Sequence, residues 1–339
     1  MSKKIEVLIT LPIADQLVEE IRQVSQDLSV TVLPVKDGSE ISPEQWQKTE
    51  VLFTMQILPS NEEAFRLRWV QSYLSGIDRI SDDPLFENQA LVLTTMSGGN
   101  ASQVAEHALS MMLALGHQLP QFLTLQQKKT WMQDRGKRYA PAELRGSTVG
   151  IIGYGSIGRQ IARLAYTFGA SVLGTKRNLM NPADMGYQVN EMGDPDGALF
   201  TRLYPPEALR SMLKECDYAV VCVPLTSSTK GLIGKEQLAA MKPTAFLVDV
   251  SRGGIVDHPA LISALSEGKL AGAALDVFPE EPLDPGSPLW QMPQVIITPH
   301  VAGFSADYNQ RATRMFIENL KRYLAGDEML NQVDFDRGY

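Results

Sequence analysis

The stretch that decides the fold reads Thr148-Val-Gly-Ile-Ile-Gly-Tyr-Gly-Ser-Ile-Gly158. Its first five residues form a short, largely apolar run, which predicts a buried strand. Three glycines follow at the spacing Gly-x-Gly-x-x-Gly, and apolar residues then recur at helical spacing from Ile157 until Gly169 ends the pattern. A strand, a glycine turn and a helix in this order are typical of the dinucleotide-binding unit of α/β proteins.

Each glycine of this loop has a physical reason. Gly153 permits the tight turn, Gly155 lets the backbone approach a pyrophosphate, and Gly158 lets the helix pack close to its strand. The backbone N–H groups near Ser156 and Ile157 would then meet phosphate at the positive end of the helix. A purely structural glycine turn is the alternative, and the strand-turn-helix context disfavours it.

Short apolar runs alternate with helical patterns on both sides of this loop, which predicts parallel sheets and the α/β class. A long helix is expected from near Ala101 until Gly116 and Pro120 end it, followed by a polar stretch, 126–145. Weak periodicity in 178–204 predicts an irregular surface excursion. Strands are expected at 5–9, 30–33, 51–53, 148–152, 171–173, 218–223, 245–250, 271–277 and 295–298, with further helices at 17–24, 235–241, 259–267 and 306–324.

The composition narrows the class of protein. The 339 residues are 44% hydrophobic and 21% charged and carry a net charge of -8, so no basic field favours nucleic acid or an anionic membrane surface. Residues 1–10 hold too short an apolar run for a secretory signal or a membrane span, and we assign no targeting segment. The two cysteines, Cys216 and Cys222, lack metal-ligand spacing, which predicts buried thiols, no metal site and a cytoplasmic location.

The type of nucleotide depends on the residues after the strand at 171–173. An NAD site places an acid about 20 residues beyond the glycine loop, on the ribose hydroxyls. Here the strand is followed by Thr175-Lys176-Arg177-Asn178, which contains no carboxylate. Because two cations there could pair with a 2′-phosphate, the sequence favours NADP, with NAD still possible. The alternative is that both cations are solvated surface charges.

Four polar residues follow or close expected strands of the second sheet, at the edge where open α/β sheets bind ligands. They are Arg252, Asp276, Glu281 and His300. Taken singly, each has an ordinary structural interpretation. Jointly they fit the reduction of a 2-oxo acid, which needs a cation for its carboxylate, a proton donor for its carbonyl and a hydride source. The other histidines, His107, His117 and His258, are expected to be structural.

With these residues in place, the sequence resembles the D-isomer-specific 2-hydroxyacid dehydrogenase family, which includes glyoxylate/hydroxypyruvate reductases and phosphoglycerate dehydrogenases. The similarity is strongest through residues 100–304 and weaker before them. A loop near residue 75 also looks like the family's substrate-domain loop. The matching stretches are 144–158, 223–233, Ser251-Arg-Gly-Gly-Ile-Val-Asp257, Gly272-Ala-Ala-Leu-Asp-Val-Phe-Pro-Glu-Glu-Pro282 and Thr298-Pro-His-Val-Ala-Gly303.

The resemblance implies a role for each matching position. His300 would be the general acid in reduction and the base in oxidation, with Glu281 paired to it and favouring its charged form. Arg252 would bind the substrate carboxylate and carbonyl, and Asp276 the nicotinamide amide. The substrate site is expected at Met55, Ser75, Gly76, Ile77, Arg252 and His300. The cofactor site is expected at Gly153, Gly155, Ser156, Ile157, Gly158, Thr175, Lys176, Arg177, Val223, Pro224, Thr229, Val250, Ser251, Arg252, Asp276, His300 and Gly303.

The resemblance also implies the domain plan. We expect a Rossmann cofactor domain, residues 101–299, inserted into a discontinuous flavodoxin-like substrate domain made of residues 1–100 and 300–339, with a crevice between them that closes on substrate. A homodimer formed through the cofactor domain is the usual state of such proteins.

The sequence leaves the substrate and one alternative function open. Which 2-hydroxy acid is used is not indicated by the sequence. A nucleotide-sensing regulatory protein like the corepressors of this family is the alternative function, although the acidic chain shows no disordered interaction tail. The sequence also departs from the family pattern, with Asp249 in place of the usual Asn and His117 in place of a frequent Arg.

Overall fold

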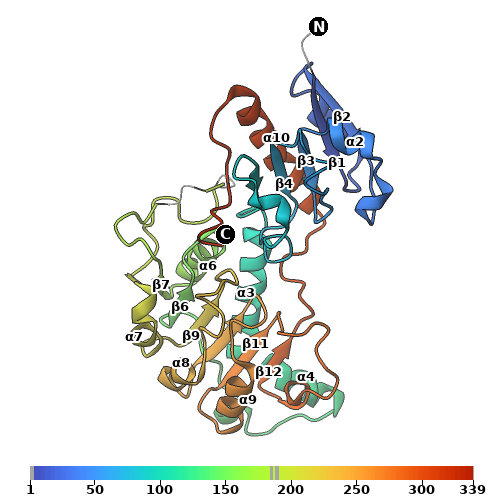
Figure 1. Cartoon of the computed structure of the whole chain (residues 1–339). Coiled ribbons are helices and arrows are strands. Elements are labelled where there is room, and N and C mark those ends of the chain that lie inside the picture. The colour runs from blue at the N-terminus through green and yellow to red at the C-terminus, as the bar shows by residue number, and fades with distance from the viewer. Residues whose placement is uncertain (1–3, 184–185, 188–190, 339) are drawn as a thin grey trace. The chain divides into compact units, whose positions relative to one another are not determined.

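The computed structural model describes residues 4–183, 186–187 and 191–338. The chain divides into two compact units, Met1–Asn100 with Ser305–Tyr339, and Ala101–Phe304 (Figure 1). The second unit runs to Phe304 rather than stopping at residue 299. The reason is that His300, Val301 and Ala302 all donate backbone hydrogen bonds to Asp276, which belongs to the sheet of that unit.

The first unit is a parallel five-stranded sheet with the order β2-β1-β3-β4-β5, the flavodoxin-like order. The short strands β4 and β5 were not predicted, because Gln71, Ser72 and Thr94 interrupt their apolar pattern. The strands are β1 (Ile5–Ile9), β2 (Leu28–Val32), β3 (Val51–Thr54), β4 (Trp69–Ser72) and β5 (Val92–Thr94), and the helices are α1 (Asp15–Arg22), α2 (Pro43–Lys48), α10 (Tyr308–Ala325) and the 3-10 turns η1 (Gly38–Glu40) and η2 (Pro84–Glu87).

The C-terminal helix α10 belongs to this sheet because both its apolar and polar side chains fit there. Phe316 stacks between Phe53 and Trp69, with ring centroids 4.6 and 5.2 Å away. Asn319 donates to the buried Gln71 Oε1 at 3.0 Å, and so does Thr94 Oγ1 at 2.9 Å. These buried polar groups are thereby satisfied, which removes the cost of burying them.

The second unit is a parallel seven-stranded sheet with the order β12-β11-β10-β9-β6-β7-β8. The chain runs outward from β6 through β7 to β8, then returns to the other side of β6 at β9. This reversal is the point at which Rossmann sheets bind nucleotides, and it confirms the expected α/β fold class. The strands are β6 (Thr148–Ile152), β7 (Ser171–Thr175), β8 (Arg202–Tyr204), β9 (Tyr218–Val221), β10 (Phe246–Asp249), β11 (Gly272–Leu275) and β12 (Val295–Ile297).

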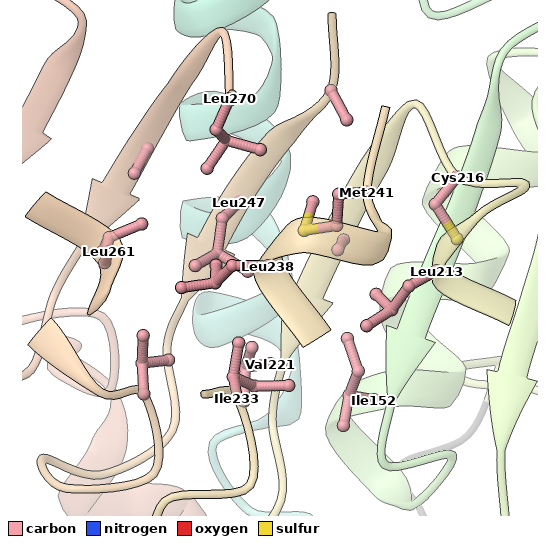
Figure 2. Packing of buried hydrophobic residues seen from close by; sticks show 14 of the residues in the cluster. Ile152, Leu213, Cys216, Val221, Ile233, Leu238, Met241, Leu247, Leu261 and Leu270 are labelled. Atoms are coloured by element: carbon pink, nitrogen blue, oxygen red, sulfur yellow. The ribbon is translucent and has the colours of Figure 1, made fainter. Parts of the chain in front are cut away.

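Two apolar clusters cover this sheet. On one side, α3 (Ala101–Gly116) and α6 (Ser156–Thr167) contact each other, and α3 also contacts β10 and β11. On the other side, α7 (Leu209–Leu213), α8 (Lys235–Ala240) and α9 (His258–Ser266) form a row, and Figure 2 shows Leu213, Leu238 and Leu261 reaching the strands from it. The remaining helices are α4 (Leu119–Gln127), α5 (Arg135–Arg138), η3 (Pro206–Ala208) and η4 (Pro288–Gln291).

Two sequence-based expectations of this unit were wrong. Pro120 does not end a helix but lies in the first turn of α4, a position that Pro tolerates, and α4 continues to Gln127. The excursion 178–204 is not simply a surface loop, since it ends in β8 and Asp194 is buried at 3% exposure. Asp194 accepts from the hydroxyl of Tyr154 at 2.8 Å, and its main-chain oxygen accepts from the buried Arg159.

No helix among the described residues is long and apolar enough to cross a membrane. Within the same described ranges, no group of three or more His, Cys, Asp or Glu side chains is arranged to hold a metal ion.

Candidate active site

The glycine loop follows β6 and has the shape that a nucleotide requires. Gly153 has a φ of +105°, and a Cβ there would lie 2.8 Å from Val223 Cγ1. A Cβ on Gly158 would lie 2.2 Å from the Gly153 oxygen, so this close packing of α6 on the loop excludes any side chain. A Cβ on Gly155 would meet nothing within 4 Å, which leaves open space beside the backbone.

The first turn of α6 points its amides into this region. Gly155 is the N-cap of α6, so no capping side chain competes for the amides of Ser156 and Ile157. Backbone N–H groups at the positive end of a helix are a ready anion site. The open space at Gly155 and these amides together fit a pyrophosphate, so the residues present here are suited to a dinucleotide.

The loops beyond β9 and β10 hold their shape through their own hydroxyls. Thr229 Oγ1 donates to the Pro224 oxygen at 2.6 Å and accepts from Thr226 N at 2.8 Å. Ser251 donates from its nitrogen to Asp249 Oδ1 at 3.0 Å and also from its hydroxyl. The hydroxyls of Thr229 and Ser251 are therefore engaged within their own loops. Val250, the residue before Ser251, is buried.

Thr175, Lys176 and Arg177 at the end of β7 were expected to contact the nucleotide, but two of these side chains bind other parts of the protein. Thr175 lies under the glycine loop, where its Oγ1 accepts from Gly153 N at 2.9 Å. Lys176 Nζ donates to the oxygens of Pro182 and Ala183, at 3.2 Å each. Arg177 is exposed, with Nη2 3.4 Å from Ser228 Oγ. Both cations therefore lie at the end of the strand, but the Lys176 ammonium is bound to the main chain of the 178–204 segment.

The structure brings together His300 and Glu281, the two side chains predicted to act as an acid–base pair. His300 Nδ1 lies 2.8 Å from Glu281 Oε2, and the other carboxylate oxygen, Oε1, accepts from Phe278 N at 3.0 Å. Because an ionised carboxylate only accepts, Nδ1 carries the proton and Nε2 is the ring nitrogen that remains for chemistry. The imidazole and the carboxylate retain 35% and 32% exposure, so a small molecule can reach them.

Arg252 lies at the same edge of the sheet. It follows β10, which pairs in parallel with β11, and β11 pairs with β12, the strand before His300. Its guanidinium Nη1 donates to the Ser251 oxygen at 2.9 Å, and the side chain is half-buried.

Asp276 organises the turn that carries His300. Its Oδ1 accepts from Thr298 Oγ1 at 2.6 Å and from Val301 N at 3.0 Å, while Oδ2 accepts from Ala302 N at 2.9 Å. Its main-chain oxygen accepts from His300 N at 2.8 Å. His300 itself has a φ of +53°, an uncommon conformation for a residue other than glycine.

Sequence reasoning missed the partner of this turn. His107 was expected to be structural, but its partners were not identified: its Nε2 lies 3.1 Å from Thr298 Oγ1 and 3.8 Å from Asp276 Oδ1. Its position on the helical face of Val104 and Ala108 was the available signal, because a polar residue on a buried face needs a partner. Gly303 similarly accepts from Gln103 Nε2 at 3.1 Å.

The expected substrate residues of the first unit lie at the ends of neighbouring strands. Met55 directly follows β3 and is 37% exposed. Ser75, Gly76 and Ile77 come shortly after β4, and Ser75 Oγ donates to the Met96 oxygen at 3.1 Å. Ile77 is buried at 5% exposure, so its side chain packs in the core of this unit.

Comparison with known proteins agrees with this geometry. The family model of the D-isomer specific 2-hydroxyacid dehydrogenase NAD binding domain matches residues 109–302. The chain is 30% identical to the D-3-phosphoglycerate dehydrogenase of Methanocaldococcus jannaschii, over 97% of this chain and 59% of that protein. It is 33% identical to the glyoxylate reductase of Pyrococcus furiosus, over 78% of this chain and 75% of that one.

A solved structure is similar over its whole length. The D-isomer specific 2-hydroxyacid dehydrogenase of Xanthobacter autotrophicus Py2, in complex with NADPH and MES, superposes with a TM-score of 0.80 at 28% identity, and the match covers 100% of both chains. The Rossmann sheet, the glycine loop and these matches lead to one conclusion: the chain belongs to the D-isomer specific 2-hydroxyacid dehydrogenase family of nicotinamide-dependent oxidoreductases.

Proposed function

We propose that this protein reduces a 2-oxo acid to the D-2-hydroxy acid with NADPH as the favoured donor. The observation that carries the proposal is the 2.8 Å contact between His300 and Glu281, at the sheet edge that also carries Arg252 and the nucleotide loop. A 2-oxo acid presents an anionic carboxylate and a polarisable carbonyl, which match a guanidinium and a proton donor.

His300 supplies the proton. Glu281 accepts a hydrogen bond from Nδ1–H and orients the ring, so that Nε2–H can protonate the carbonyl oxygen as it gains charge. In the reverse direction the neutral Nε2 accepts the proton of the hydroxyl. The nicotinamide, when bound, supplies or accepts the hydride at carbon.

Arg252 holds the substrate. Its planar guanidinium can donate to the carboxylate and the carbonyl oxygen together, which fixes the angle of the carbonyl and polarises it. The hydrogen bond from Nη1 to the Ser251 oxygen limits where the fork can point. From the family resemblance, we also propose Met55, Ser75, Gly76 and Ile77 as substrate-binding residues.

The nucleotide is assigned to the glycine loop, with its pyrophosphate at Gly155, Ser156 and Ile157. We favour NADPH because no carboxylate follows β7 and because Arg177 is exposed there. The Xanthobacter autotrophicus relative was solved with NADPH, which supports the same preference. The engagement of Lys176 with Pro182 and Ala183 makes Arg177 the stronger candidate for the 2′-phosphate.

The test is a turnover assay with purified protein. Loss of NADPH absorbance is followed with glyoxylate, hydroxypyruvate and longer 2-oxo acids, NADH is run in parallel, and the chirality of the product is determined. We expect turnover with at least one acid, a higher kcat/KM with NADPH, and the D product. Absence of turnover with every acid and either nucleotide would overturn the proposal.

We also propose a homodimer in the cytoplasm. The helix α4 and the segment after it expose Leu119, Phe122, Leu123 and Trp131 at 48, 39, 59 and 78%, an apolar surface that a second copy would cover. Both cysteines are free thiols, as a reducing compartment requires. Light scattering should give twice the chain mass, and Leu123→Glu should give a monomer. A monomeric wild type would contradict the dimer.

A further inference from the structure

The helix α3 holds both ends of the turn that carries His300. Gln103 and His107 lie one helical turn apart on α3, so their side chains share a face. His107 Nε2 lies 3.1 Å from Thr298 Oγ1, at the start of the turn. Gln103 Nε2 donates to the Gly303 oxygen at 3.1 Å, at its end. Both ends of the turn from Thr298 to Gly303 are therefore hydrogen-bonded to side chains of α3.

The direction of the hydrogen bonds follows from the donor count. Both carboxylate oxygens of Asp276 act as acceptors, from three donors in all: Thr298 Oγ1, Val301 N and Ala302 N. Thr298 has one hydroxyl proton and gives it to Asp276 at 2.6 Å. Its oxygen must then accept from His107, so the Nε2 of His107 carries a proton.

This chain of bonds reaches His300. The hydroxyl of Thr298 and the amides of Val301 and Ala302 meet on one carboxylate, and the main-chain oxygen of Asp276 receives the amide of His300. The φ of +53° at His300 is maintained only if these bonds over-determine the turn. Losing the His107 donor frees Thr298 to rotate away and removes one of the constraints on Asp276.

We propose that His107 is a positioning residue for the catalytic His300, acting through Thr298 and Asp276. This inference rests on the proposed function, because it concerns the turnover that His300 supports. His107 touches neither the His300 ring nor Glu281 in the contacts described above. Its effect is on the geometry of the turn, and misplacing a reacting group by a fraction of an ångström lowers the rate without abolishing binding.

The first test compares two substitutions of His107. His107→Leu removes the donor, and we expect kcat to fall about tenfold or more while KM for NADPH changes less than about threefold. His107→Gln carries an Nε2–H at a similar reach, and we expect it to restore kcat to within about threefold of wild type. His117→Leu, an exposed histidine just beyond the same helix, is the matched control and should leave kcat unchanged.

The second test is a double-mutant cycle with Thr298→Val, which removes the hydroxyl that links His107 to Asp276. We expect His107→Leu to have no further effect on kcat in the Thr298→Val background. Independent, multiplying losses would overturn the proposed chain. Equal losses in His107→Leu and His107→Gln would also overturn it, because they would show that ring packing rather than donation matters.

A third measurement needs no turnover and separates this inference from the proposed function. Amide hydrogen exchange of Val301 and Ala302 should be faster in His107→Leu than in wild type, and unchanged in His107→Gln. Exchange that is the same in all three proteins would overturn the inference even if the enzyme is active. If exchange is faster in His107→Leu than in wild type but the wild-type protein turns over no 2-oxo acid, the inference stands and only the proposed function is refuted.

Discussion

Two buried aspartates lie at the ends of neighbouring strands and differ in how many hydrogen-bond donors their carboxylates receive. Asp249 closes β10 and Asp276 follows β11, with exposures of 1 and 2%. Asp276 receives donors on both carboxylate oxygens. Asp249 receives only Ser251, on Oδ1, and none of the described residues donates to its Oδ2.

The missing donors matter for the protonation of Asp249. Burial raises the pKa of Asp249 to about 7 despite the hydrogen bonds from Ser251, and the nearby Asp276 adds to the rise. A buried carboxylate with a full set of donors is a stable anchor, and one with half a set is costly when ionised. The same residue type, one strand apart, is thus an organiser of the His300 turn in one place and a pH-dependent weak point in the other.

Among substitutions at or beside these two aspartates, the largest effect is expected at Asp276. Asp276→Asn places an N–H where the carboxylate accepts, so a donor faces Ala302 N or Thr298 Oγ1. We expect kcat to fall about 100-fold and the free energy of unfolding to fall by roughly 2–4 kcal/mol. Turnover and urea titration measure the two effects. Wild-type values for both would mean that the carboxylate does not hold the turn.

A smaller effect on turnover is expected at Arg252, three residues after Asp249. Arg252→Lys keeps the charge but loses the planar fork, so we expect kcat/KM for the 2-oxo acid to fall about 10- to 100-fold with little change in stability. Initial rates over a substrate range measure it, with the nucleotide Kd as the internal control. A loss confined to nucleotide binding would remove Arg252 from the substrate site.

The smallest effect is expected from Asp249→Asn, and it has a definite pH dependence. Since the folded pKa of Asp249 is raised to about 7, folded protein binds its proton more tightly than unfolded protein does. The stability from this group is fully present below the unfolded pKa of 3.8 and is lost as the pH rises through 7. The variant avoids this loss, and we expect it to gain on the order of 1–3 kcal/mol at pH 8.

The gain of Asp249→Asn should grow from pH 4.5 to about 7 and then level off, as urea titrations at a series of pH values would show. The exposed Asp82→Asn is the matched control, with no gain at any pH. A difference that is independent of pH would contradict a buried ionised carboxyl at Asp249.

The features best predicted from the sequence are those set by short motifs or by the period of apolar residues. The glycine loop needs only a strand, a turn and a helix, and the polar residues Arg252, Asp276 and His300 follow strands whose ends share one edge in any parallel sheet. The α/β class and most strand positions were therefore predictable. The departure at Asp249 was also visible, although its half-satisfied carboxyl was not.

The rest depends on contacts between residues far apart in the chain. The partner of His107 is 191 residues away, so spacing gives no sign of it. Lys176 looks like an available cation until the excursion turns Pro182 and Ala183 toward it. The strands β4 and β5 are short and partly polar, and they form because Gln71 and Thr94 find Asn319 and Trp69 in the folded unit.

The role of His300 is tested by the single-turnover rate of NADPH oxidation by a 2-oxo acid in wild type and in His300→Gln. We expect the rate to fall about 100- to 10,000-fold, because the proton donor is lost, while the nucleotide Kd stays within about threefold. A variant that oxidises NADPH at the wild-type rate would contradict the role of His300, and with it the proposed chemistry of this site.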